Sequence, residues 1–341
     1  MALKAFAEAL DAANSGRGKR RPVHVLLGNG FSRACKDDIF AYGALFDRAD
    51  FRALSRHVPA AFASLATRDF EKVMRALRDS AQLIRVYEPA GGDLANAFEA
   101  DAAGLREVLV QAIAGSHPDL PGDISADAYA ACKRFLAHFD RIVTVNYDLL
   151  LYWALMQAEV TPQVRSDDGF RKPDREADYV TWEPDHSYDQ NVYYLHGALH
   201  LFDSGTEIQK YTWINTGVRL IDQIRTALAA GLYPMFVAEG SSGEKVERIR
   251  HNAYLSKAER SLLNLGGSLF VYGLSLADND AHILNAILRS KIDRVYVSVY
   301  GDTGTDANRE IMKRAKSLEV DGRGKGLLVD FYDAASAQVW G

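Results

Sequence analysis

The sequence contains little cysteine. Only Cys35 and Cys132 occur among 341 residues, and they lie far apart. Because there is no Cys-x-x-Cys pair, a zinc ribbon is excluded, and a disulfide framework is not expected. We expect both side chains to be buried thiols in a reducing compartment.

Long apolar runs are also missing. No stretch approaches the roughly 20 residues that a membrane-spanning helix needs, so we expect no membrane contact. Residues 1–10 mix Ala, Leu and Phe with Lys4 and Glu8, which is typical of an amphipathic helix and not of a signal peptide. The sequence therefore favours a cytoplasmic protein.

An excess of basic residues is absent as well. The net charge is −5, which argues against direct binding of nucleic acid. The short basic run at residues 17–21 is better interpreted as a solvated linker than as a binding patch. A chain of 341 residues is long enough for about two domains and a large core.

One stretch near the N-terminus carries a clear pattern. Val23 to Leu27 is a short apolar run, rich in β-branched and aliphatic residues, which predicts a buried strand of a parallel sheet. Gly28 and Gly30 then permit a tight turn and close approach of a ligand to the backbone, and Ser32 is a candidate helix cap. A strand, a glycine turn and a helix N-terminus together favour an anion such as pyrophosphate. An ordinary tight turn is the alternative, since Arg33 replaces the third glycine of the dinucleotide fingerprint.

The remainder of the chain alternates between helical and strand-like patterns. Apolar residues recur at helical spacing over residues 45–137, which predicts an insertion of several helices. Strand-like runs return near residues 142–145, 191–195, 268–275, 294–300 and 326–332. This alternation predicts an α/β protein with a doubly wound, Rossmann-like parallel sheet. We expect residues 161–190 to be loop, and Gly243-Glu244-Lys245 to be an ordinary turn.

The pattern divides the chain into five segments. Residues 1–44 hold the N-terminal helix and the first strand, turn and helix, and residues 45–137 form the helical insertion. Residues 138–204 continue the Rossmann-like domain, residues 205–262 form a second mixed or helical insertion, and residues 263–341 complete the Rossmann-like domain.

Four strand ends carry polar or glycine-rich groups. In an open α/β sheet, ligands bind outside the carboxyl ends of the strands, so we expect these groups to line one site. They are Gly28-Asn29-Gly30-Phe31-Ser32, Asn146-Tyr147-Asp148, His196-Gly197 and Gly273-Leu274-Ser275. Taken singly, Asn146 and Asp148 are also common as helix caps, and His196 as a strand-end histidine.

The ordered set of motifs resembles the sirtuin-like superfamily. That family has a Gly-Ala-Gly-x-Ser turn, an Asn-x-Asp after a strand, a His-Gly and a Gly-x-Ser, in the order found here. Asn29 replaces the usual small residue, and the four zinc cysteines of the protein deacylases are missing. The chain is therefore most similar to the bacterial sirtuin-like branch, whose members commonly cleave NAD as antiphage defence effectors. The resemblance implies NAD as the substrate and no metal.

The residue types suit cleavage of the bond between nicotinamide and ribose. The leaving group already carries positive charge, and the transition state resembles an oxocarbenium ion. Asn146 can position a ribose hydroxyl or water, and His196 is the group that titrates near neutrality and can act as general base. Asp148 either orients the nicotinamide amide or caps the following helix. The other residues expected to contact NAD are Gly28, Asn29, Gly30, Phe31, Ser32, Gly273, Ser275, Asp302 and Asn308.

Two other functions stay open at this point. A module that senses NAD or ADP-ribose without cleaving it would need the same binding motifs but no base. An NAD-dependent deacylase is disfavoured by the missing zinc cysteines. An unrestrained NADase would harm its host, so we expect restraint through a homo-oligomer, with a separately encoded ATPase or sensor as a further candidate partner.

Overall fold

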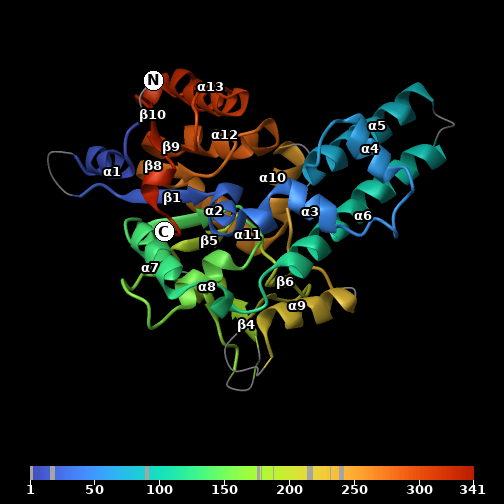
Figure 1. The fold of residues 1–341 in the computed structure, drawn as a ribbon, viewed down its shortest axis with the longest axis horizontal. Helices are drawn as coiled ribbons and strands as arrows, with labels where there is room; N and C mark the ends of the chain where they lie inside the picture. The colour runs from blue at the N-terminus through green and yellow to red at the C-terminus, as the bar shows by residue number, and fades with distance from the viewer. Residues whose placement is uncertain are drawn as a thin grey trace.

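A parallel sheet forms the centre of the protein. The computed structural model describes residues 3–15, 20–88, 92–174, 177, 179–186, 188–212, 218–230, 232–237 and 242–341. Within these residues, the sheet has six strands in the order β10-β9-β8-β1-β2-β5 (Figure 1). They are β1 (Val23–Leu27), β2 (Arg141–Thr144), β5 (Val192–Tyr194), β8 (Gly266–Tyr272), β9 (Lys291–Val299) and β10 (Leu328–Asp333). The predicted doubly wound α/β fold is confirmed.

The strand order is that of a dinucleotide-binding fold. Counted along the chain, the strands of this sheet lie in the order 3-2-1-4-5-6, which is the Rossmann arrangement. The order reverses between β1 and β8. In such sheets the ligand lies at this switch point, outside the carboxyl ends of the strands.

β1 lies in the interior of the sheet, between β8 and β2, with both of its faces covered. All five side chains of Val23–Leu27 are buried, as expected for a strand covered on both sides. Val25 pairs with Ile142 of β2 on one side and with Phe270 of β8 on the other. The predicted bounds of this strand are confirmed.

Helices pack around the sheet and connect its strands. α11 contacts β5, α12 and α13 contact β9, and α1 contacts β10. The helices of this body are α1 (Phe6–Asn14), α2 (Asn29–Phe40), α7 (Ala126–Leu136), α8 (Leu150–Met156), α9 (Leu220–Ala229), α10 (Ser242–His251), α11 (Ala253–Leu263), α12 (Ala281–Arg289) and α13 (Asp306–Asp321). Residues 17–19 of the basic run at 17–21 lie outside the described residues.

Four further helices form an arm that extends from the body (Figure 1). They are α3 (Tyr42–Arg48), α4 (Val58–Ser64), α5 (Phe70–Tyr87) and α6 (Gly92–Ser116). α5 begins at an Asp69 cap, whose carboxylate accepts the backbone N–H of Glu71 at 2.9 Å. Its apolar positions then recur every three or four residues and face α6. The helices predicted in this part of the sequence are therefore present.

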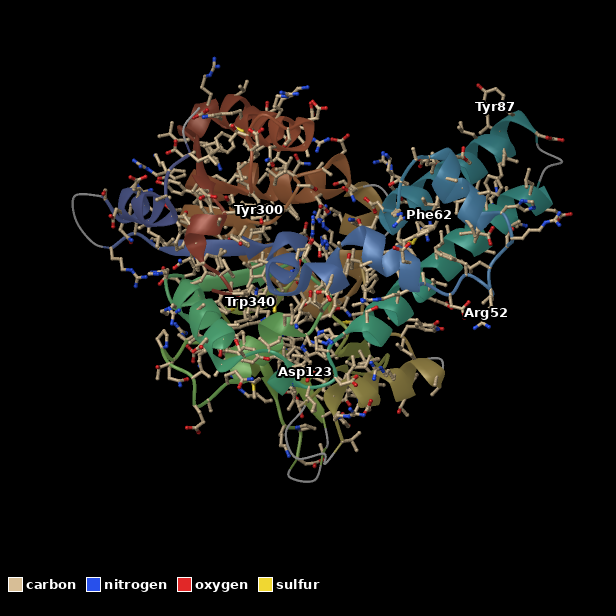
Figure 2. The ribbon with its side chains drawn as sticks, in the orientation of Figure 1. Arg52, Phe62, Tyr87, Asp123, Tyr300 and Trp340 are labelled. Atoms are coloured by element: carbon tan, nitrogen blue, oxygen red, sulfur yellow. The ribbon has the colours of Figure 1, made fainter. Side chains whose placement is uncertain are left out.

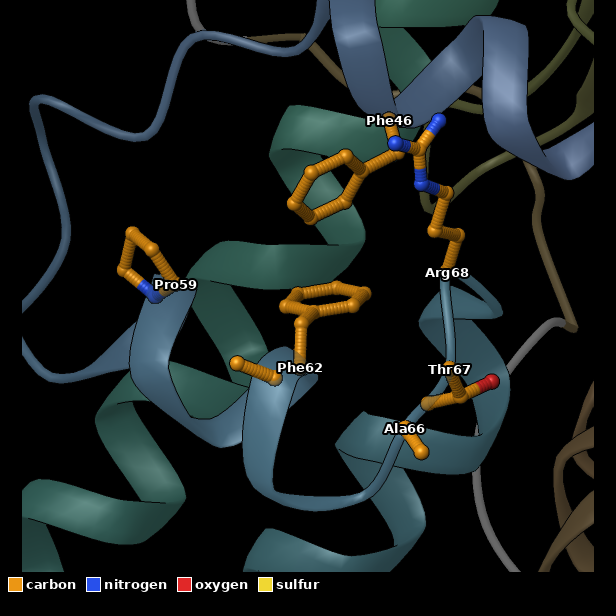
Figure 3. Close-up of a pocket in the computed structure, with 7 residues that line it drawn as sticks. Phe46, Pro59, Phe62, Ala66, Thr67 and Arg68 are labelled. Carbon is orange, nitrogen blue, oxygen red and sulfur yellow. The ribbon is translucent and has the colours of Figure 1, made fainter.

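The arm encloses a shallow apolar pocket. It has a volume of about 390 Å³ and is lined mainly by Phe46, Pro59, Phe62 and Arg68, whose side chains lie around the opening in Figure 3. The Arg68 guanidinium lies 5.5 Å from the Phe46 ring centroid, in a cation–π contact. The lining contains no carboxylate, imidazole or thiol, so the pocket offers no acid–base chemistry.

A small antiparallel sheet occupies part of a region that the sequence predicts as loop. In the described part of the chain it has four strands in the order β3-β4-β7-β6. They are β3 (Phe170–Arg171), β4 (Tyr179–Trp182), β6 (Leu201–Asp203) and β7 (Ile208–Tyr211). The loop prediction for residues 161–190 is therefore wrong at β3 and β4, because strands of two to four residues are too short to show a period.

The C-terminal residues hold α2 in place. Trp340, labelled in Figure 2, packs against Phe31 with ring centroids 5.1 Å apart. Its indole N–H also donates to the Phe31 carbonyl at 2.8 Å. The C-terminal segment thus supports the helix that follows the glycine turn.

None of the helices in the described residues is long and apolar enough to cross a membrane.

Candidate functional site

The glycine turn after β1 packs directly against the end of β8. A Cβ added at Gly30 would lie 2.4 Å from the Gly273 Cα, and one added at Gly28 would lie 2.7 Å from the Gly273 carbonyl oxygen. Gly273 also has a positive φ of 68°, which favours glycine. These residues are glycines because two backbones meet at the switch point with no room for a side chain.

The backbone N–H groups of this turn are engaged within the protein. Gly28 N–H donates to the Tyr272 carbonyl at 2.9 Å, and Gly30 N–H donates to the Gly273 carbonyl at 2.8 Å. These two N–H groups, predicted to face an anion, instead join β1 to β8. Contact of NAD with the glycines stays a prediction, and it would have to use other atoms of the turn or displace these bonds.

Ser32 does not cap the helix, contrary to prediction. α2 begins at Asn29, three residues earlier, and its N-cap residue is Gly28. Ser32 therefore lies in the first turn of the helix, where its side chain is buried and faces the end of β2.

Ser32, Asn146 and Asp148 form one hydrogen-bonded group, which we call the amide cluster. The Asn146 amide donates to the Ser32 Oγ at 2.8 Å and to the Gly28 carbonyl at 3.0 Å. The Ser32 hydroxyl donates to Asp148 in a short hydrogen bond. Asp148 also accepts the Leu150 N–H at 2.9 Å, as the capping interpretation of this residue predicts. The motif residues after β1 and β2 are thus brought together.

The amide cluster is buried. Asn146 is 8% exposed and Asp148 is 6% exposed, so their placement at the end of the sheet does not make them surface residues. Burial raises the pKa of Asp148, while hydrogen bonds from Ser32 and the Leu150 backbone lower it. The cluster therefore orients the Asn146 amide rigidly.

Tyr147 links the amide cluster to a second group of polar residues. Its hydroxyl donates to the Val237 carbonyl at 3.1 Å and approaches Glu71 Oε1 at 3.4 Å. Its ring lies parallel to that of His196, with centroids 6.5 Å apart. The outer residues of the Asn-Tyr-Asp motif, Asn146 and Asp148, therefore belong to the amide cluster. The central residue, Tyr147, contacts the second group.

We call the second group the histidine cluster: Glu71, His196, Lys245, Asp280 and His282. His196 Nε2 lies 2.9 Å from His282 Nε2. The Lys245 ammonium donates to Glu71 at 2.9 Å and to Asp280 at 3.2 Å. Lys245 is 1% exposed, so two carboxylates, and not water, surround its ammonium group. The cluster joins the arm, α10, α12 and the end of β5.

Gly197 allows the chain to turn away beneath His196. It has a positive φ of 82°, and a Cβ there would lie 2.0 Å from the Met235 carbonyl oxygen. Val237 N–H donates to the His196 carbonyl at 3.0 Å, which holds residues 235–237 against the site. In the His-Gly pair, His196 is thus a candidate functional residue, and Gly197 is required by the backbone conformation.

Sequence reasoning missed four of the five members of the histidine cluster. Lys245 was predicted in an ordinary turn, but it lies in the first turn of α10. Glu71 lies in the stretch predicted as a helical insertion and belongs to none of the four motifs. Asp280 and His282 follow the Gly-x-Ser strand end, and that proximity was the one available signal. The turn before α10, at residues 239–241, lies outside the described residues.

The electrostatics of the histidine cluster keep its imidazoles neutral. Burial holds the pKa of His196 well below its usual value, and Lys245 and His282 act in the same direction. Burial raises the pKa of Glu71 to about 7, against the lowering influence of Lys245. For Lys245 itself, the two carboxylates outweigh burial, so its pKa is raised and its charge is retained.

Three residues of this cluster are arranged as possible metal ligands. Ligand atoms of His196, Asp280 and His282 all lie within 4.8 Å of one another. Imidazole nitrogens and a carboxylate oxygen suit zinc and similar ions. The Lys245 ammonium, 3.2 Å from Asp280, opposes a cation there.

The remaining predicted residues have other contacts. The Asn29 side chain donates to the Phe40 carbonyl at 3.2 Å, and Phe31 is a core residue against Trp340. The Asn308 amide donates to the carbonyls of Tyr300 and Asp302 and so fixes the loop after β9. Ser275 and Asp302 are exposed at the ends of β8 and β9. Contact of these residues with NAD stays a prediction.

Comparison with known proteins adds a family and no function. No curated protein matches the sequence. A family model described as a domain of unknown function, DUF4917, matches residues 25–340. That match spans the sheet except for the first two residues of β1, together with the arm and both clusters, and the chain therefore belongs to the DUF4917 family.

Proposed function

We propose that the protein is an NAD⁺ glycohydrolase that releases nicotinamide and ADP-ribose. The observation that supports this most is the meeting of the amide and histidine clusters on one loop, residues 146–148. This loop follows β2, beside the switch point of a sheet with Rossmann strand order. The resemblance of the four motifs to the sirtuin-like superfamily supplies the choice of NAD.

The reaction places modest demands on the protein. The C1′–N bond breaks with its electron pair moving to nicotinamide, and water then forms the new C1′–O bond and loses a proton. Because the developing ribosyl cation is strongly electrophilic, a weak base is enough to take that proton. This suits His196, whose pKa is lowered by burial. Asn146, held by Ser32, would orient the ribose or the water through its carbonyl oxygen.

The first experiment is a direct assay. Purified protein is mixed with NAD, and free nicotinamide and ADP-ribose are measured over time. Equal amounts of both products support the proposal. No products, with NAD bound and intact, would favour the second candidate, an NAD or ADP-ribose sensor.

The sensor has one specific observation in its favour. Asn146 and His196 are both buried, and the Asn146 amide and His196 Nε2 already have protein partners. A site with engaged polar groups holds its shape well but must open to react. NAD-dependent deacylation is the third and least favoured function, because this chain lacks the four zinc cysteines of the protein deacylases.

The wider biology rests on the resemblance alone. We propose an antiphage role in the cytoplasm, restraint through a homo-oligomer, and a separately encoded ATPase or sensor as a possible component. Sedimentation at micromolar concentration, run together with the NAD assay, tests the assembly. A strict monomer that is fully active alone would contradict it.

A further inference from the structure

His282 contacts the proposed base of the reaction. It lies in the first turn of α12, and its Nε2 is 2.9 Å from the Nε2 of His196. The two rings are nearly parallel, at 28°, with centroids 5.1 Å apart. Both side chains are buried.

Two neutral imidazoles in such contact must have complementary tautomers. A neutral imidazole has one N–H donor and one lone pair. The two Nε2 atoms lie 2.9 Å apart, a distance at which a single proton joins them. One Nε2 therefore donates and the other accepts. Only if His196 donates is its Nδ1 left with the lone pair that a base needs.

The surroundings of His282 favour the acceptor role for its Nε2. The Asn279 backbone acts on His282 as a hydrogen-bond acceptor, against the dominant effect of burial. Because Nε2 faces His196, this acceptor acts on Nδ1, although the contact falls short of full hydrogen-bond geometry. A proton on Nδ1 of His282 leaves its Nε2 as a lone pair directed at His196.

His282 is also held firmly. Asp280, two residues earlier, is bonded to Lys245, which is bonded to Glu71 at the start of α5. The Asn279 amide donates to Glu71 at 2.8 Å. The turn that carries His282 is thereby fixed to α10 and to the arm.

We propose that His282 is a positioning residue that accepts the Nε2–H of His196 and leaves the Nδ1 of His196 free to take the proton from water. This inference rests on the proposed function for its catalytic meaning. The tautomer itself is a property of the resting protein, so it can be tested separately. The competing arrangement is a metal ion bound by His196, Asp280 and His282.

The first test reads the tautomer directly. The full chain is labelled with ¹⁵N-histidine, the His196 signals are assigned with the His196→Asn variant, and nitrogen shifts are recorded near pH 7. We expect Nε2 of His196 to be protonated and Nδ1 to be unprotonated. The opposite tautomer would overturn the proposal, and so would one equivalent of Zn²⁺ that binds and shifts both histidines together.

The second test uses turnover. His282→Leu removes the acceptor, and we expect kcat to fall by about 10-fold or more, with KM changed little, because only a fraction of His196 then has a free Nδ1. His282→Gln restores an acceptor and should recover most of the loss. His24→Leu is the control, since His24 is a buried histidine at the other end of β1.

The outcomes separate this inference from the proposed function. If the wild type releases no nicotinamide, the proposed function fails while the nitrogen shifts still decide the role of His282. If NAD is cleaved but His282→Leu matches the wild type, the role of His282 is wrong and the NADase stands. If His282→Leu is impaired and His282→Gln is no better, the contact is structural and the proposal is overturned.

Discussion

The amide cluster and the histidine cluster meet on one short loop but are assembled differently. Asn146 and Asp148 follow the end of β2, and Ser32 lies in the first turn of the helix after β1; the three are joined without a cation. The histidine cluster instead takes Glu71 from the arm and Lys245 from α10. The sheet alone determines the first cluster, whereas the second exists only when the inserted segments are docked. The two should therefore respond differently to substitution.

The largest effect is expected at Lys245. Lys245→Met leaves the carboxylates of Glu71 and Asp280 facing each other in the interior, so we expect a loss of about 3–5 kcal/mol of stability. Urea unfolding measures it. Lys313→Met is the control, because Lys313 is exposed and its ion pair with Glu310 is worth under about 1 kcal/mol. Equal stabilities of the two variants would show that the histidine cluster does not depend on its cation.

A side chain at the switch point should cost nearly as much. Gly30→Val forces β1 and β8 apart, and overpacking of this kind costs about 3 kcal/mol. The effect should appear in the unfolding midpoint and not only in NAD affinity. Gly115→Ala is the matched control, since a Cβ there meets nothing and alanine favours a helix. A fully stable Gly30→Val protein would contradict the close contact with Gly273.

The clusters should be equally necessary for turnover. We expect Asn146→Ala and His196→Ala each to lower NAD cleavage by on the order of 10²-fold, with smaller effects on NAD binding. Asn146→Ala also removes the donor to Ser32 and Gly28, so a stability loss of about 1–3 kcal/mol should accompany it. Nicotinamide release, NAD binding and urea unfolding are measured together. Wild-type turnover by His196→Ala would return His196 to a structural role.

Acid should weaken the protein through its buried histidines. His24, His117 and His282 have pKa values lowered to about 4, with burial as the main cause. At these three histidines the unfolded chain binds more protons than the native one below pH 6.5, so their contribution to stability falls as the pH decreases from 6.5 to about 4. Glu71, whose pKa is raised to about 7, acts in the opposite direction but is a single group against three. Each histidine should cost about 1.4 kcal/mol at pH 5.5 relative to neutral pH. Urea unfolding at pH 7.5 and 5.5, at constant ionic strength, tests this; unchanged or higher stability at pH 5.5 would contradict it.

The last prediction is of two absences: structural zinc and deacylase activity. With only Cys35 and Cys132, we expect no structural zinc and no deacylation of peptides. Elemental analysis of the purified protein and an assay with an acetylated peptide and NAD test these points. Stoichiometric zinc, or NAD-dependent loss of acetyl, would contradict them.

The sequence predicts those parts of the protein whose neighbours lie within a single pattern. β1 is a short, mostly apolar run, and Asn146 and His196 directly follow runs of the same kind, so both could be assigned to the end of a sheet. Burial of these two residues was not predictable, because it depends on the segments packed above them. Ser32 was misassigned because helix starts are uncertain by several residues, and here the helix begins three residues earlier.

The histidine cluster marks the limit of sequence reasoning. Glu71 and Lys245 are 174 residues apart, and each looks like an ordinary charge on a helix. Their pairing follows from how the arm docks, which no local period encodes. The short strands β3 and β4 were missed for a related reason, since β3 is defined by its pairing with β4, and β4 by its pairing with β3 and β7.

Glu71 also connects the arm to the histidine cluster. α5 runs for 18 residues, about 27 Å, from the turn holding Glu71 to the exposed Tyr87 at its far end (Figure 2). A partner that binds the far end of α5 can alter the site only if it binds the protein more tightly when Glu71 is in one position than when it is in another. By linkage, whatever factor such a partner imposes on NAD affinity, NAD imposes on the affinity for the partner. Binding of a partner to the arm and binding of NAD to the site would then be coupled through one conformational equilibrium.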